Sequence, residues 1–121
     1  MQHAALAYGK VAKQTSSPRE VEATLLLKAA ARLQAVSDTW DSNHEQVDEA
    51  LLYNRKLWSV FLTSVTRNDN PLPEIVRQNV ANLGLFVMKQ TMAAMAEPQR
   101  EKLTSLISIN REIAAGLMGR G

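Results

Sequence analysis

Two asparagine–arginine pairs interrupt apolar helical patterns, at Asn54-Arg55 within LLYNRKLW and at Asn110-Arg111 within LISINREIAAGL. A third asparagine, Asn79, has a similar place in a later apolar stretch. An amide both donates and accepts hydrogen bonds, and it is costly to bury without partners. We therefore expect all three asparagines to be structural polar residues that bond to one another or to a neighbouring backbone group. Contact with a ligand is the alternative.

Residue types that could perform catalysis or hold a metal ion are few and scattered. The only histidines are His3 and His44, and neither has a second histidine three or four residues away. The sequence has no cysteine and no glycine-rich phosphate loop. The acidic pair Asp48-Glu49 stands near a predicted helix start, where carboxylates favour the helix dipole. We expect a non-enzymatic protein that uses no metal and no cofactor.

The elements that position these residues are marked by prolines and glycines. Ser17 as an N-cap, Pro18 as the first helical residue and Glu20 three residues after the cap form a capping box. Gly119 suits a C-terminal cap. The predicted helices span residues 18–40, 45–66, 73–96 and 98–118.

Short connections between successive helices favour antiparallel packing. The sequence therefore predicts an all-α fold, a compact bundle of about four mostly antiparallel helices, with an irregular orthogonal bundle as the alternative. Residues 1–16 are predicted to form an N-terminal arm or short helix, and residues 17–121 a single helical domain.

Composition and charge indicate an ordinary globular chain. Hydrophobic residues make up 45% and charged residues 21%, and no apolar run approaches the length of a membrane-spanning helix. The formal net charge is only +2, and most basic residues are interspersed with acids. We expect a cytoplasmic protein that does not associate with membranes and has no dense phosphate-binding stripe.

Helical spacing predicts one core line on each of the last three helices. The predicted core residues are Val47, Leu51, Asn54, Trp58, Phe61 and Val65; then Val76, Asn79, Val80, Leu83 and Val87; then Leu103, Leu106, Ile107, Asn110, Ile113 and Leu117. Gly84 lies inside the third helix, and close approach of a neighbouring helix would explain it.

The second and third helices carry a second apolar line each, which is more than one core face requires. These lines are Ala50, Tyr53, Leu57 and Val60, and Ala81, Leu85, Met88, Met92 and Met95. Such a line is either covered by the bundle or left for a partner, and methionine suits both uses. The candidate partner-binding residues are Leu57, Val60, Leu85, Met88, Met92 and Met95.

The order of the segments resembles the FlaF family of bacterial flagellar biosynthesis regulators. The resemblance rests on NRKLW, NPLPEIVRQN and INREIAAGL, and it covers nearly the whole chain. It implies a cytoplasmic, all-helical, non-enzymatic factor needed for flagellin production and filament assembly. Two mechanisms are associated with the family: binding of flagellin as a secretion chaperone, and control of flagellin messenger translation with or against the regulator FlbT.

Helix-in-groove recognition favours the first mechanism. The resemblance implies a client, flagellin, whose terminal segments are amphipathic and unpacked before export, and such a segment needs an apolar groove. RNA binding is the rival, and it would use Lys10, Lys13, Arg19, Arg55 and Lys56. A scaffold acting through FlbT is a third possibility. A second copy of the chain could also cover the extra apolar line, so both a monomer and a homodimer are compatible with the sequence.

Overall fold

The computed structural model describes residues 18–41 and 44–119, and within these ranges all regular structure is helical. Four helices follow one another: α2 (Pro18–Asp38), α3 (His44–Val65), α4 (Glu74–Ala96) and α5 (Arg100–Leu117). The predicted all-α bundle of four helices is therefore confirmed. The arm predicted for residues 1–16, and the Ser17 half of the capping box, lie outside the described residues.

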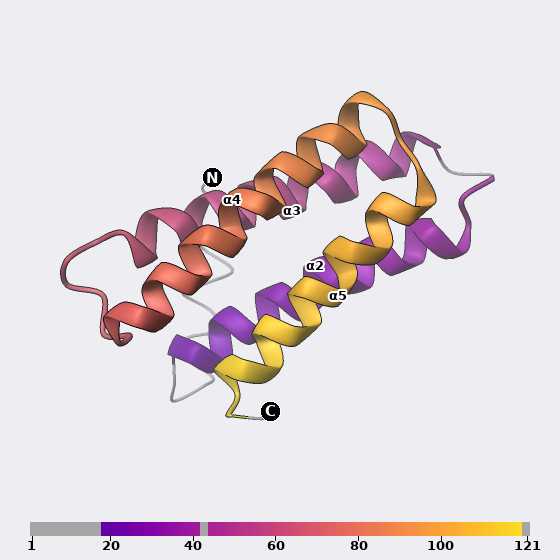
Figure 1. The fold of residues 1–121 in the computed structure, drawn as a ribbon. Helices are drawn as coiled ribbons and strands as arrows, with labels where there is room; N and C mark the ends of the chain where they lie inside the picture. Colours follow the sequence, from indigo (N-terminus) through magenta and orange to yellow (C-terminus); the bar gives the residue numbers. More distant parts are fainter. Residues whose placement is uncertain (1–17, 42–43, 120–121) are drawn as a thin grey trace.

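The helices run alternately up and down, in two layers (Figure 1). One layer holds α2 and α5, and the other holds α3 and α4. The Nε of Arg100, at the start of α5, donates to the Oγ of Ser37 near the end of α2, at 3.3 Å. These two helices are thus antiparallel, and the arrangement is the up-down bundle rather than the orthogonal alternative.

The helix ends fall within two residues of their predicted positions. Pro73 is the N-cap of α4, with ψ at 146°, so that helix begins one residue later than predicted. Gln99 holds the same place before α5 in an extended conformation. Gly119 has a φ of 75°, a left-handed conformation that glycine adopts without strain, and its N–H donates to the carbonyl of Gly116 at 3.1 Å. The predicted glycine cap is present.

The core lies between the two layers. All six residues predicted for the core line of α3 are buried, as are Leu103, Leu106, Ile107 and Asn110 of α5. Trp58 is fully buried, and its ring packs against that of Phe61 at a tilted angle, with the centroids 5.6 Å apart. Such aromatic pairs remove large apolar areas from water, and this one anchors α3 in the centre of the bundle.

The core line predicted for α4 is wrong in part. Its buried residues are Gly84, Val87, Thr91 and Ala94, whereas Val76 and Asn79 are exposed. Asn79 directly precedes the half-buried Val80, and one residue of helix turns a side chain by about 100°. Asn79 therefore points away from the core, and it is not one of the interior polar residues.

Gly84 allows α4 to lie unusually close to α3. A Cβ atom at this position would stand 2.5 Å from Cδ2 of Leu62 and 3.3 Å from Cε3 of Trp58. The backbone of α4 thus occupies space that any larger residue would need for its side chain. The close approach predicted to explain a glycine inside this helix is therefore confirmed.

Candidate functional site

Four buried side chains form a continuous chain of hydrogen bonds across three helices. Nε1 of Trp58 donates to Oδ1 of Asn110 at 2.8 Å, and Nδ2 of Asn110 donates to Oδ1 of Asn54 at 2.7 Å. Nδ2 of Asn54 then donates to Oγ1 of Thr91 at 3.3 Å. Oγ1 of Thr91 in turn donates to the carbonyl of Val87 at 2.6 Å. We call these four side chains the buried relay.

Trp58 sets the direction of the buried relay. An indole N–H can only donate, so the atom of Asn110 that faces it must be the amide oxygen. The amide nitrogen of Asn110 then faces Asn54 and requires an oxygen there, and the nitrogen of Asn54 is left to face Thr91. Each amide therefore has one orientation that satisfies its neighbours.

The two interior asparagines are thus occupied by the protein itself. Trp58, Asn54, Thr91 and Asn110 have no solvent-exposed area. A buried polar chain of this kind stabilises the fold when every member is bonded, and it specifies how the helices align. Asn54 and Asn110 therefore lie with Thr91 and Trp58 in the relay, while Asn79 lies on the surface. Spacing alone could not identify Thr91, because a threonine on a helix more often bonds to its own backbone.

The six candidate partner-binding residues fall into two groups. Leu57, Met88 and Met95 are half-buried and pack against the core, whereas Val60, Leu85 and Met92 are exposed by 53%, 63% and 54%. The row of Met88, Met92 and Met95, which could have packed in the core or bound a partner, is thus divided. Met88 and Met95 pack against the core, and Met92 is exposed.

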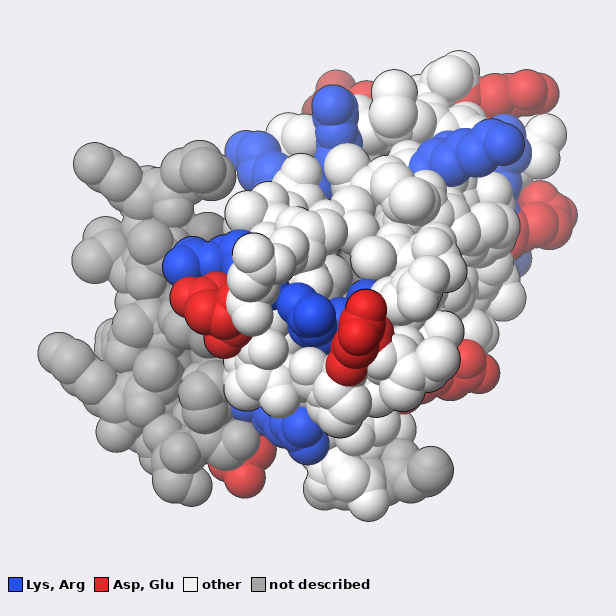
Figure 2. Space-filling view, turned by 60° about the vertical axis from the view of Figure 1, so that its left-hand side comes forward, with Lys and Arg blue, Asp and Glu red and all other residues white. Residues whose placement is uncertain are grey.

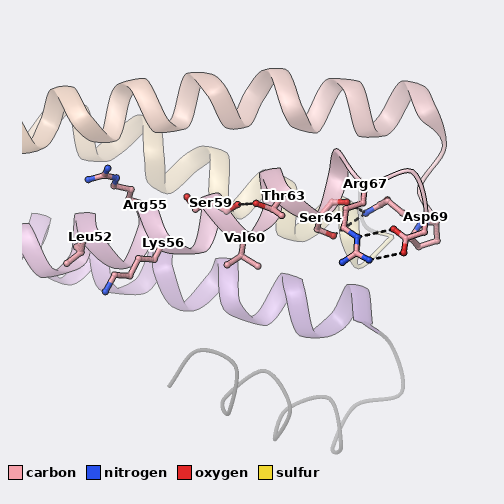
Figure 3. Close-up of a pocket in the computed structure, with 11 residues that line it drawn as sticks. Leu52, Arg55, Lys56, Ser59, Val60, Thr63, Ser64, Arg67 and Asp69 are labelled. Carbon is pink, nitrogen blue, oxygen red and sulfur yellow. Dashed lines mark hydrogen bonds and ion pairs between the residues drawn. The ribbon is translucent and has the colours of Figure 1, made fainter. Parts of the chain in front are cut away.

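These candidates do not form one surface. Leu62 packs against Gly84 and so marks the side of α3 that faces α4. Val60 is two residues away from Leu62, which turns it by about 160° to the opposite side. Figure 3 shows the same arrangement, with Arg55 directed towards α4 and Val60 towards α2. Leu57 and Val60 are therefore separated from Leu85 and Met92 by the body of α3.

The exposed apolar side chains of α4 include Phe86, which is not among the six candidate partner-binding residues. Phe86 is exposed by 49%, next to Leu85 and about one and a half turns before Met92. We call Leu85, Phe86 and Met92 the α4 surface. Exposed apolar groups that lie in one region are typical of protein-binding sites.

A cation–aromatic cluster joins α2 to α3 on the other side of the molecule. The guanidinium of Arg32 lies 4.3 Å from the ring centroid of Tyr53, and Nζ of Lys28 lies 5.9 Å from it. Burial raises the pKa of the Tyr53 phenol, and the positive charge of Arg32 partly opposes that rise. The ring stays neutral at physiological pH and presents its face to both cations.

The residues considered for RNA binding do not converge in the described part of the chain. Lys10 and Lys13 lie outside it, Arg19 is exposed near the start of α2, and Arg55 and Lys56 are exposed in the middle of α3. Figure 2 shows basic side chains spread singly over one face, several of them beside acidic ones. A phosphate backbone is normally bound by clustered cations, so this distribution gives RNA binding little support.

Residues 18–41 and 44–119 contain neither a membrane-spanning helix nor a metal-binding cluster. No helix within them is both long and apolar enough to cross a lipid bilayer. The same residues contain no group of three histidine or acidic side chains that could hold a metal ion.

Comparison with protein families identifies the family of this chain. A family model described as flagellar protein FlaF matches residues 4–117, which is nearly the whole chain. No curated protein and no solved structure matches.

Proposed function

Because the chain belongs to the FlaF family of flagellar proteins, we propose that it binds flagellin as a secretion chaperone and thereby promotes flagellin production and export. The role is non-enzymatic. The observation that carries the proposal is the α4 surface, where three large apolar side chains are about half or more exposed.

An amphipathic client helix is the partner that such a surface fits. Leu85 and Met92 are seven residues apart, so they lie on one line of α4 two turns from each other. A client helix buries anchors at i, i+3, i+4 and i+7, which repeat over the same length. The half-buried Met88 lies between them and provides an apolar floor.

The interaction is expected to be reversible. A client segment that becomes ordered on binding loses conformational entropy, which lowers the affinity for a given contact area. Methionine side chains adapt to different apolar partners, so Met92 also suits a client whose sequence varies. Both properties are appropriate for a chaperone that must release flagellin at the export apparatus.

The test is a titration of purified flagellin with the full-length protein and with the Leu85→Asp, Met92→Asp double variant. We expect the double variant to lose at least tenfold in affinity, because two carboxylates would be placed where apolar groups must be buried. Its melting temperature should change little, since both side chains are exposed. Leu27→Asp is the matched control, because Leu27 is an exposed apolar residue on α2.

Flagellin binding that survives in the folded double variant would contradict the proposed site. Control of flagellin messenger translation with or against FlbT would then become the better proposal. Titration of flagellin leader RNA at two salt concentrations tests that role, since a phosphate-binding site weakens steeply as salt increases.

A further inference from the structure

We propose that the outer face of α3 is a second docking site, which binds an acidic amphipathic helix of a partner protein. This α3 face is an open hollow of about 810 Å³ that ends at the loop after α3. Its lining includes Leu52, Arg55, Lys56, Val60, Thr63 and Arg67. No residue of the α3 face belongs to the α4 surface, so the inference does not rest on flagellin binding.

The charges of the α3 face favour an acidic partner. Residues 52–67 contain three basic residues and no acidic one. Asp69, the acid at the end of the face, is already held by Arg67 through two hydrogen bonds of 3.1 and 3.0 Å. Within the described residues, Arg55 and Lys56 make no hydrogen bond and no ion pair. Their charges are therefore available to carboxylates of another protein.

The two available cations stand on either side of the α3 face. Figure 3 shows Arg55 directed towards α4 and Lys56 directed towards α2. A helix lying along the face between them could place one acidic residue on each flank. Because the cations are exposed, each such pair contributes modestly, and its main effect is on specificity and association rate.

The apolar residues of the α3 face supply the contact between the flanks. Leu52 and Val60 are both exposed, and they are eight residues apart. At 1.5 Å per residue this spacing is about 12 Å, which matches two turns of a partner helix. Thr63 donates its hydroxyl to the carbonyl of Ser59 at 2.9 Å, so that hydroxyl is turned back to its own helix. The part of the α3 face between Arg55 and Lys56 is thus less polar than its residue types alone indicate.

A protein helix fits this face better than a nucleic acid does. Only Arg55 and Lys56 are available as cations, and exposed Leu52 and Val60 offer nothing to a phosphate backbone. An amphipathic helix with acidic flanks uses both kinds of residue. The observations therefore favour an acidic amphipathic segment of about 12–15 residues, the length of the face at 1.5 Å per residue.

The test uses the full chain and a fluorescent synthetic peptide of 15 residues, with leucines at helical spacing and glutamates on both flanks. A second peptide, used for comparison, has lysine in place of every glutamate. Fluorescence anisotropy should give at least tenfold tighter binding for the glutamate peptide at low salt, a difference of about 1.4 kcal/mol. The preference should shrink as salt screens the exposed charges.

Variants locate the binding. Arg55→Glu with Lys56→Glu should remove the preference for the glutamate peptide, and Val60→Asp should weaken binding of both peptides. Lys89→Glu with Arg111→Glu is the matched control, because both residues are exposed on other helices and the change in net charge is the same. Melting curves show which variants remain folded.

Four results would overturn the inference. The first is equal affinity for the two peptides, and the second is an equal loss in the control variant. The third is tighter binding of a single-stranded RNA of matched length than of the glutamate peptide at the same residues. A homodimer that Val60→Asp dissociates would likewise assign the α3 face to a second copy of the chain.

Discussion

Asn110 is the residue on which two other buried groups depend. Its substitution by alanine leaves Nε1 of Trp58 without an acceptor and Oδ1 of Asn54 without a donor. Each orphaned buried group costs ~1–3 kcal/mol, so we expect Asn110→Ala to lower the free energy of unfolding by at least about 2 kcal/mol. For a domain of this size that is a fall of roughly 8 °C in the melting temperature.

Asn79→Ala is the matched control for this substitution. Asn79 is an exposed asparagine on a helix, so its replacement should change the melting temperature by no more than ordinary surface substitutions do. Equal melting temperatures for Asn110→Ala and Asn79→Ala would mean that the relay contributes nothing to stability.

Glu22 gives the stability of the protein a dependence on pH. Burial raises the pKa of this carboxyl above its ordinary value of 4.5, and the positive charge of Arg19 partly opposes the rise. The charged form is thus disfavoured in the folded state, and this penalty is present at neutral pH. It is relieved as the pH falls through the folded-state pKa, because the folded protein then takes up a proton before the unfolded chain does.

We therefore expect Glu22→Gln to raise the melting temperature at pH 7. The gain should diminish as the pH falls through the raised pKa of Glu22, because the wild-type carboxyl then takes up a proton in the folded state. Thermal scans of both proteins across this pH range make the comparison. A gain that is constant with pH would assign the effect to packing rather than to charge.

At the scale of single helices, the sequence was most informative where residues restrict the backbone. Pro73 and Gly119 mark helix ends that the structure places within a residue of the prediction. The core side of α3 was also predictable, since its five apolar members follow helical spacing along one line that only Asn54 interrupts.

The inward face of α4 could not be predicted in the same way. Apolar residues occur nearly all around this helix, so helical spacing does not select one face. The inward face is marked best by two residues that are not strongly apolar, Gly84 and Thr91. Gly84 lies inward because α3 is too close for a side chain, and Thr91 lies inward because Asn54 donates a hydrogen bond to it. Both reasons depend on a neighbouring helix, and the spacing of residues within one helix does not show which helix packs against it.

The close approach of α3 and α4 makes Gly84→Ala informative. We expect this variant to be destabilised despite the better helix propensity of alanine, because the new methyl group would overlap Leu62 and press on Trp58. In a Leu62→Ala background the main overlap is absent, and the penalty should fall by at least about 1 kcal/mol. Chemical denaturation of the four proteins in this cycle measures the coupling. Independent, additive effects would mean that the two helices separate easily at this point.

At the scale of the whole molecule, the α4 surface and the α3 face belong to two helices of one layer and share no residue. The exposed apolar area of α4 can also be closed by a second copy of the chain, which would form a symmetric dimer. Flagellin and a second copy would then compete for the same three residues.

Light scattering distinguishes these states. We expect flagellin to convert any dimer into a complex containing one 13.4 kDa chain, because both interactions are proposed to use the α4 surface. The Leu85→Asp, Met92→Asp variant should remain a monomer with or without flagellin. A dimer that persists when flagellin is bound would show that self-association uses another part of the molecule.

Hydrogen exchange of the Trp58 indole proton can report on opening of the bundle. It is shared between a tryptophan on α3 and an asparagine on α5, and neither side chain has any area exposed to solvent. Deuterium from the solvent can replace this proton only when the two layers come apart. Its exchange rate, followed in a single NMR signal, therefore reports how often the entire bundle opens.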